Sequence, residues 1–544
     1  MTIVKKTILS VLVLGALVST GVFASGNRSA APSASVSATT TPVGTYPVST
    51  SVGLSYWSTL NANVSPHYTN FGDTPFAKAL QQQTGIKITY QHPPETAVTE
   101  AFNLMIVDPQ NMPNIIEYYW LTQYPGGPEK AISDGVILRL NDYIDRYAPN
   151  YKAFLQAHPD LDKMVKTDQG SYYVFAFLKD DERLLNTQGL MIRKDWLDDL
   201  GLALPTTIDD WHNVLTQFKT QKGASAPFTI TWSNNLRLFM PSFGFLKSWY
   251  VNADDGKVHF GQYDAGYRQW LQTMAQWYKE GLIDPDVVSV RAASTLNTNM
   301  TTGKSGAAVA SVGSGLQTWM NAMTPTQPKY EVVALPYPAL TRNAKAVYGI
   351  PGAAYSGQDS AAISAASTPQ QIEIACRLLD YAYSEKGHIL YNFGIEGESF
   401  TMVNGVPTYT PLIMKNPQGW SISQAILAYS KGAGSGPFVQ DINYLTQYYS
   451  GVPQAASAPA DMTIPGADKY LLPPVTATSD ESAELASITT DVNTYVDEFT
   501  TNVVIGNIEL TDAAWNKYLS DVRGLGIERA LAIQNAALDR YNKR

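Results

Sequence analysis

The hydrophobic and polar positions are most regular in residues 193–219, RKDWLDDLGLALPTTIDDWHNVLTQFK. Thr207 followed by Asp210 fits a capping box at the start of a helix. Gly201 can take the left-handed conformation that ends the helix before it. The second helix has one apolar face, formed by Ile208, Trp211, Val214, Leu215 and Phe218. The pattern predicts two helices joined by a short turn, with no group suited to catalysis.

From residue 51 onward, short apolar runs alternate with helical patterns. Residues 52–57, 86–91 and 114–120 read as strands, and 76–85 as a helix that ends at Gly85. This order predicts an α/β protein whose sheets carry helices on both faces. Further helices are expected at 264–280, at 369–386 and from Asp491 to the end, whereas the Pro/Gly/Ser-rich residues 410–480 predict no clear element.

Candidate ligand-binding residues follow the predicted strands. In sheets of this kind the ligand lies beyond the carboxyl ends of the strands. Aromatic side chains occur at several such ends, and amide or carboxylate groups occur near some of them. We expect the ligand-binding residues to be Trp57, Tyr118, Trp120, Trp232, Asn234, Gln317, Trp319, Tyr355 and Glu396. For any single aromatic residue, a place in the core is the competing interpretation.

The N-terminus carries an export signal. Residues 1–24 have Lys5 and Lys6, an apolar run and small residues before a cleavage position, which is typical of a secretory signal peptide. The next position resembles that of the acylated Cys in bacterial lipoproteins, but it is Ser25. Residues 25–50 are rich in Ser, Thr, Ala and Pro and predict a flexible tether. The protein is expected at the cell surface if the native residue 25 is Cys, and otherwise secreted.

Composition excludes some classes of function. The 544 residues are 44% hydrophobic, which is enough for two lobes. The net charge is −9 with no basic patch, so a nucleic-acid partner is not expected. The single cysteine, Cys376, lies among apolar residues of a predicted helix and is expected to be a buried, inert thiol.

Catalytic motifs are weak or missing. The TGKS at 302–305 is similar to a phosphate loop, but Thr298 replaces its first Gly. The sequence contains no HExxH, CxxC or GxSxG motif. The acidic run Asp180–Glu182 reads as a solvated loop. We therefore expect no catalytic, cofactor-binding or metal-binding residue, and no enzyme activity.

Five segments together resemble one family. Residues 193–219 are similar to a segment of the extracellular solute-binding proteins of bacterial ABC sugar importers, in the family-1 lipoprotein group of Gram-positive bacteria. The other four segments are 277–286 (WYKEGLIDPD), 300–311 (MTTGKSGAAVAS), 377–409, which contains GIEG, and the closing helices at 515–544. The matches occur in the expected order and extend over nearly all of residues 51–544.

The resemblance implies a two-lobed, periplasmic-binding-protein-like fold of type II, each lobe a sheet flanked by helices, with the ligand between them. Lobe 1 would comprise 51–180 and 353–410, and lobe 2 would comprise 181–352 and 411–544. Chain crossings are expected near 179–189 and 348–357, and the lobes would close on the ligand by a hinge motion. The protein would be a monomer that delivers its ligand to permease subunits.

Carbohydrate is the expected ligand class, since sugar rings stack on Trp and Tyr while their hydroxyls bind polar side chains. An oligosaccharide fits best, although peptides also suit an aromatic cleft. Relatives that bind acidic oligosaccharides often carry a calcium loop where this chain reads TQKGASAPFTIT at 220–231, so no such calcium site is expected. A polysaccharide-active hydrolase and a surface-binding protein without a transport role are the alternatives.

Overall fold

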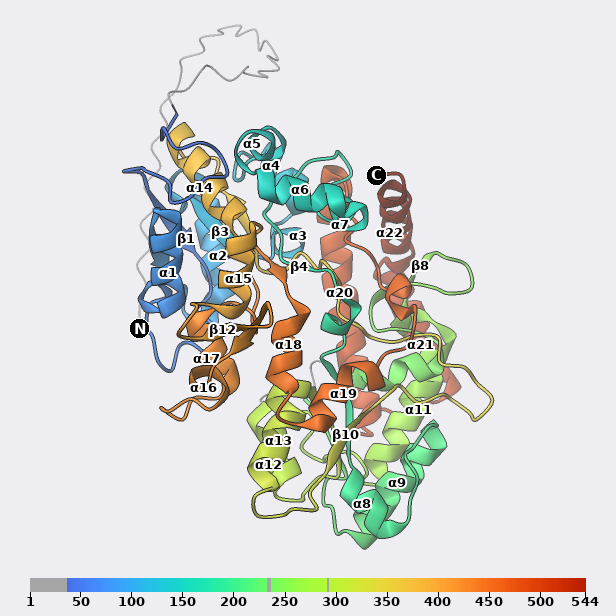
Figure 1. Ribbon diagram of the computed structural model, residues 1–544. Coiled ribbons are helices and arrows are strands. Elements are labelled where there is room, and N and C mark those ends of the chain that lie inside the picture. Colours follow the sequence, from blue (N-terminus) through green and yellow to red (C-terminus); the bar gives the residue numbers. More distant parts are fainter. Residues whose placement is uncertain (1–36, 232–235, 291–292) are drawn as a thin grey trace, which may run out of the picture. The chain divides into compact units, whose positions relative to one another are not determined.

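The two helices predicted at 193–219 form as expected. A computed structural model of the protein describes residues 37–231, 236–290 and 293–544 (Figure 1). Helix α8 (Lys194–Leu200) ends at Gly201, whose φ is 65°. Helix α9 (Ile208–Gln221) begins with the predicted capping box, in which the Thr207 hydroxyl accepts from the Asp210 backbone N–H. All five residues of its apolar face are buried.

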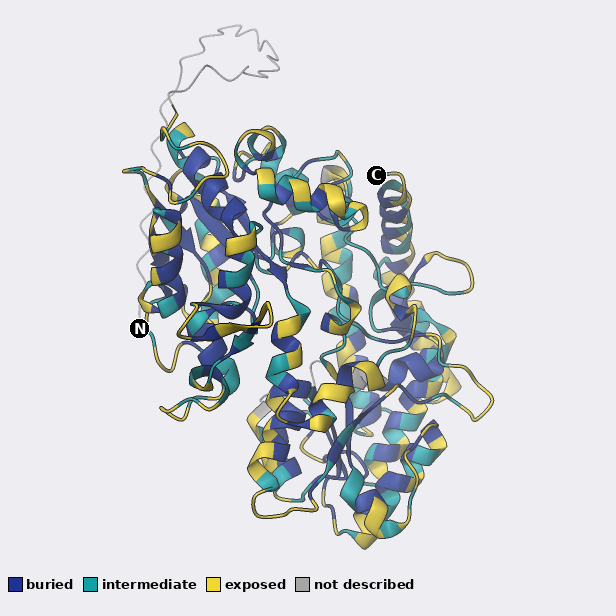
Figure 2. Ribbon diagram, viewed as in Figure 1, coloured by how far each residue is buried: buried dark blue, intermediate teal, exposed yellow. Residues whose placement is uncertain are grey.

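The first sheet has the strand order β11-β3-β1-β2. Its parallel strands are β1 (Gly53–Trp57), β2 (Lys87–Gln91) and β3 (Ile115–Tyr118), and β11 (Ser360–Ile363) runs antiparallel beside β3. Helix α14 (Pro369–Tyr381) packs on β1 and β11. The alternating apolar residues of these short strands thus reach the core of the first lobe, drawn dark blue in Figure 2.

The second sheet has the order β10-β5-β9-β6. It comprises β5 (Gln188–Arg193), β6 (Phe228–Thr229), β9 (Ala307–Ser311) and β10 (Val332–Leu335). Successive residues of β5 serve different cores, as strand geometry requires. Leu190 and Ile192 pack with α9 and α11 (Ala265–Lys279), while Met191 packs with α19 (Pro453–Asp461).

Within the described ranges, three chain segments connect the lobes. The first runs from β4 (Leu178–Lys179) through the 3-10 helix η4 (Glu182–Leu184) to β5, and the second is residues 336–359 between β10 and β11. These two correspond to the predicted crossings. The third, which was not predicted, is β14 (Val439–Gln440), which pairs in parallel with β4 and leads into α18 (Ile442–Tyr449).

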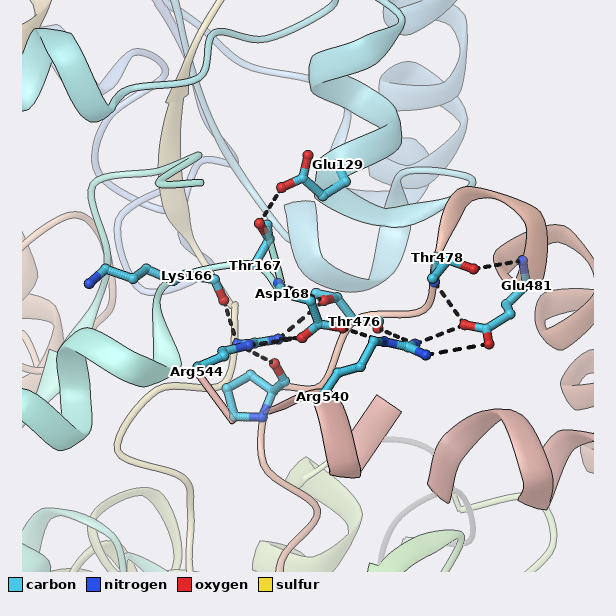
Figure 3. Close-up of polar contacts among 10 residues, drawn as sticks. Glu129, Lys166, Thr167, Asp168, Thr476, Thr478, Glu481, Arg540 and Arg544 are labelled. Atoms are coloured by element: carbon cyan, nitrogen blue, oxygen red, sulfur yellow. Dashed lines mark hydrogen bonds and ion pairs between the residues drawn. The ribbon is translucent and has the colours of Figure 1, made fainter. Parts of the chain in front are cut away.

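The C-terminal helices α20 (Ser479–Val504), α21 (Asp512–Gly524) and α22 (Ile527–Asn542) form where a helical end was predicted. Helix α20 contacts α11 and α22, and also α4 (Gly127–Ser133) of the first lobe. At the end of α22, four charged residues form what we term the C-terminal clasp: Asp168, Glu481, Arg540 and Arg544 (Figure 3). The Asp168 carboxylate lies 2.8 Å from Arg540 and 2.6 Å from Arg544.

The predicted tether at 25–50 is too long. From Ser37 onward the chain packs against α14: the Ser37 hydroxyl donates to Glu373 at 2.9 Å, and Arg377 donates to the Thr41 carbonyl at 2.9 Å. Val48 is buried. Glu373 and Arg377 form a buried ion pair, and the N-terminal segment adds hydrogen bonds from the Ala38 N–H to Glu373 at 2.9 Å and from Arg377 to the Pro42 carbonyl at 3.1 Å. Residues 25–36 and the predicted signal peptide lie outside the described residues.

Two other elements differ from the prediction. The helix expected at 369–386 is two helices, because α14 ends at Tyr381 and the Ser384 hydroxyl caps the start of α15 (Glu385–Phe393). Residues 410–480 contain α16 (Pro411–Met414), α17 (Ile422–Tyr429), α18 and α19. Helix α17 contacts α1 (Pro75–Thr84) of the first lobe, and its Ala425 and Ile426 pack in the same cluster as Met191 of β5. The lobe boundaries stay predictions.

None of the helices in the described ranges combines the length and the apolar character that crossing a membrane requires.

Candidate functional site

Candidate ligand-binding positions lie at the strand ends of the two sheets and beside the crossing segments. In the first sheet, Trp57, Gln91 and Tyr118 end parallel strands and therefore share one edge. In the second sheet, Gln188 pairs with Ser311, the last residue of β9, at the edge from which the first crossing enters. Ligand sites in α/β proteins occupy such edges.

Two predicted aromatic residues lie at the edge of the first sheet. Trp57 packs edge-on against Tyr118, with ring centroids 5.5 Å apart, and the Tyr118 hydroxyl lies 3.2 Å from that of Thr99. Both side chains are almost fully buried, and the neighbouring Tyr119 is half-buried. This corner therefore presents little aromatic surface beyond Tyr119.

Four other predicted ligand-binding residues are buried in the core. The indole of Trp120 donates to the Ile116 carbonyl at 3.0 Å, and that of Trp319 to Asn297 at 2.6 Å. The remaining two are hydrogen-bonded as well: the Gln317 amide donates to the Tyr448 carbonyl at 2.7 Å, and the hydroxyls of Tyr355 and Tyr173 lie 2.7 Å apart. A ligand could contact these side chains only after the packing around them changed.

The other three predicted residues fall elsewhere. Glu396 is exposed in the turn before β12 (Phe400–Val403). Trp232 and Asn234 lie outside the described residues.

A cavity of about 410 Å³ lies beside the crossing segments. Trp249, the first residue of β7 (Trp249–Val251), is half-buried in its wall and packs on Phe260 with ring centroids 4.9 Å apart. Sequence reasoning missed Trp249, because no strand was predicted there. The cavity is lined by Lys179, Leu185, Thr187, Gln188, Leu246, Lys247, Trp249, Ile350, Pro351, Gly352, Ala353, Leu471 and Leu472.

A larger cavity of about 760 Å³ shares Lys179, Leu185, Ile350 and Pro351 with the first. Its other lining residues include the acidic run Asp180–Glu182, which the sequence indicated as a solvated loop. Asp180 and Glu182 are indeed exposed, and Asp181 pairs with Arg183 at 2.6 Å. The crossing segments thus border two cavities of different charge.

An aromatic surface is also formed where the loop that follows β1 meets the loop that precedes α17. The rings of His67 and Trp420 stack with centroids 4.1 Å apart, and Tyr68 meets Trp420 edge-on. His67 is exposed and Trp420 half-buried. Trp420 belongs to the stretch for which no element was predicted, so the only signal in the sequence was an isolated Trp. A flat aromatic surface of this kind suits the apolar face of a sugar ring.

A buried ion pair supports the edge of the first sheet. Glu117 of β3 lies 3.1 Å from the Lys431 ammonium and accepts a hydrogen bond from Tyr56 at 2.6 Å. Burial raises the pKa of Glu117, and the Lys431 charge opposes that shift. Within the described residues, no group of three or more His, Cys, Asp or Glu side chains is arranged to hold a metal ion.

Comparison with known proteins shows the family. The chain is 25% identical, over 75% of its length and 76% of the relative's, to the fructooligosaccharide ABC transporter substrate-binding protein FusA of Streptococcus pneumoniae. It is 24% identical to lipoprotein LipO of Bacillus subtilis, over 62% of this chain and 66% of LipO.

Among solved structures, the alginate-binding protein AlgQ2 without calcium superposes with a TM-score of 0.73 at 21% identity, over 90% of this chain and 99% of AlgQ2. The fold is therefore the two-lobed α/β fold of periplasmic binding proteins. Residues 69–389 match the family described as bacterial extracellular solute-binding protein, and the chain belongs to that family.

Proposed function

We propose that this protein is the extracellular substrate-binding component of an ABC importer, which captures an oligosaccharide between its lobes and presents it to the permease. The observation that carries this proposal is the cavity at the crossing segments, where half-buried Trp249 lies beside Thr187 and Gln188 in a member of the solute-binding family. An indole and nearby hydroxyl or amide groups are the chemistry that a sugar requires. FusA is named for fructooligosaccharides, which supports an oligosaccharide, rather than a single sugar, as the ligand.

Binding requires no reaction. The lobes are joined by the three crossing segments, and closing them on a ligand would bury the sugar and mark the loaded state for a transporter. A hydrolase would instead need two carboxylates that converge on the ligand. Incubating an oligosaccharide with the pure protein and analysing the products by chromatography separates these functions, since a binding protein returns the sugar intact.

Titration of tryptophan emission with a panel of oligosaccharides tests the proposal, with Trp249→Ala as the informative variant. A bound sugar ring against the indole should shift the emission, and the variant should bind at least about tenfold more weakly while unfolding like the native protein. Trp319→Ala is the contrasting variant, since its side chain is fully buried. It should cost about 3–5 kcal/mol of stability. A panel in which no oligosaccharide binds would contradict the proposal.

The location at the cell surface is part of the same proposal. Replacement Ser25→Cys would supply the thiol that a lipid anchor needs, and a diacylated residue holds a protein firmly at a membrane. In a Gram-positive host we expect the Ser25 form in the culture medium and the Cys form in the detergent phase. Detergent partitioning of the Ser25 form would point to a different anchor.

A further inference from the structure

The 410 Å³ cavity is lined by two lysines and by no acidic residue. We term it the lysine pocket, after Lys179 of the first crossing and Lys247 near the start of β7. Its other lining groups are the polar Thr187 and Gln188, the ring of Trp249, and aliphatic or backbone surface. The acidic run Asp180–Glu182 lines the larger neighbouring cavity instead.

Neither lysine has an ion-pair partner within the described residues. The Lys179 ammonium has two contacts, the Leu184 carbonyl at 3.4 Å and the face of Phe177 at 5.8 Å. Lys247 shows no ion pair in the same part of the structure. Residues 1–36, 232–235 and 291–292, which the structure does not describe, contain no Asp or Glu, so all side-chain carboxylates of the chain lie in the described residues.

An unpaired charge of this kind is costly. Desolvation lowers the pKa of Lys179, and no neighbouring carboxylate opposes that shift. A partly buried ammonium without a counter-charge loses hydration and gains little in return. Other lysines near the lobe edges, such as Lys431, are paired. The chain as a whole carries a net charge of −9, whereas the lysine pocket carries a local positive charge, opposite in sign to that of the whole protein.

We propose that the lysine pocket binds an anionic group carried by the oligosaccharide, with a sugar carboxylate as the chemistry that fits it, while Trp249 contacts the ring face. This inference rests on the proposed function and narrows its ligand class to acidic oligosaccharides. A ligand carboxylate would supply the counter-charge that the protein withholds from Lys179 and Lys247. Charge-assisted hydrogen bonds to a carboxylate are about twice as strong as neutral ones, so the pocket would discriminate strongly against neutral sugars.

Isothermal titration with matched ligands tests the inference. The probes are trigalacturonate, its fully methyl-esterified form, which keeps the rings and removes the charges, and inorganic phosphate. The proteins are the native form, Lys179→Met, Lys247→Met and the control Lys78→Met, which replaces an exposed lysine on α1. We expect the native protein to bind trigalacturonate at least about tenfold more tightly than the ester, and to lose that affinity as salt rises.

Each pocket variant should bind trigalacturonate about tenfold more weakly, with little effect on the ester, and Lys78→Met should behave as the native protein. Met preserves the aliphatic stem, and neither lysine has an ion pair to lose, so both variants should melt no lower than the native protein. Equal affinity of the native protein for trigalacturonate and its ester would overturn the inference, as would phosphate binding as tight as that of trigalacturonate. If only neutral oligosaccharides bind, the lysine-pocket inference is wrong, but the proposed function still holds. If no oligosaccharide in the wider panel binds, both the inference and the proposed function are wrong.

Discussion

Asp380 of α14 shows how a single carboxyl group sets a pH dependence. Its side chain is fully buried and accepts hydrogen bonds from the Tyr151 backbone N–H at 2.8 Å and from Asn150 at 2.6 Å. Burial raises its pKa from the usual 3.8 to about 6, because these hydrogen bonds offset only part of the desolvation. The folded protein therefore holds this proton more tightly than the unfolded chain does.

Replacement Asp380→Asn should change the pH profile of stability. In the native protein, the raised pKa favours the folded state below about pH 3.8, and this contribution is lost as pH rises through 6. The loss amounts to about 3 kcal/mol, at 1.36 kcal/mol per pKa unit. The variant should thus gain stability relative to the native protein between pH 4 and pH 7, measured by urea unfolding. Asp254→Asn, at an exposed turn, is the control, and parallel profiles for Asp380→Asn and native protein would refute the prediction.

Residue identity alone did not reveal which aromatic side chains reach solvent. Trp120 opens the short helix α3 (Trp120–Gln123) directly after β3, and that change of direction turns its indole into the core. Trp249 and Trp420 are only half-buried and expose part of their side chains to solvent, although neither follows a predicted strand. Position along a strand is thus a weaker guide to a binding residue than the packing of the element that follows.

At the scale of elements, α9 depends on its N-terminal cap. The Thr207 hydroxyl accepts from Asp210, and the Asp210 carboxylate accepts in return from the Thr207 backbone N–H at 3.1 Å. The cap orients the helix whose apolar face carries Trp211 and Phe218 into the core of the second lobe.

Replacement Thr207→Ala should therefore destabilise the second lobe by about 1 kcal/mol, because the Asp210 N–H loses its side-chain acceptor. Thr220→Ala, at an exposed position of the same helix, provides the comparison and should leave stability unchanged or slightly raised. Chemical unfolding of both variants measures the difference. Equal midpoints would show that the cap contributes nothing.

At the scale of the whole molecule, the C-terminal clasp ties the first lobe to the last helix. The Arg544 side chain is 4% exposed, and Asp168 is the carboxylate shared by Arg540 and Arg544. Removing one partner of a buried ion pair leaves the other charge desolvated without compensation.

Asp168→Asn should accordingly cost about 3–5 kcal/mol of stability. Glu484→Gln removes the partner of an exposed pair with Arg529 and should cost at most about 1 kcal/mol. Thermal and urea unfolding of the two variants make the comparison. A smaller loss for Asp168→Asn than for Glu484→Gln would mean that the clasp does not stabilise the fold.

Closure of the lobes is a prediction at the same scale. The second crossing segment contains Gly349, Gly352 and Gly357, whereas Gly189 of the predicted first crossing lies in β5. Gly357 has a φ of 74°, which other residues rarely adopt. Small-angle scattering should show a smaller radius of gyration when a bound oligosaccharide saturates the protein. An unchanged radius would indicate a rigid binding protein.

The sequence by itself determined the local elements and the fold class. Helix α9, its cap and its apolar face are predicted from residues that lie within fourteen positions of one another. Each of β1, α1 and β2 is likewise predicted from its own short stretch of sequence. The predicted burial of Cys376 is also confirmed, and burial raises the pKa of its thiol. These features depend on periodicity and capping, which act between near neighbours in the chain.

Only the tertiary structure decided the crossing segments and the surfaces they expose. Strand β14 pairs with β4 across some 260 positions, and Ser37 binds Glu373 on α14, so the polar segment that begins at Ser37 is packed against that helix. The lysine pocket joins Lys179 and Lys247 with Leu471 near the C-terminal helices. Such contacts form between distant segments, and their burial depends on how complete elements pack, which no local pattern encodes.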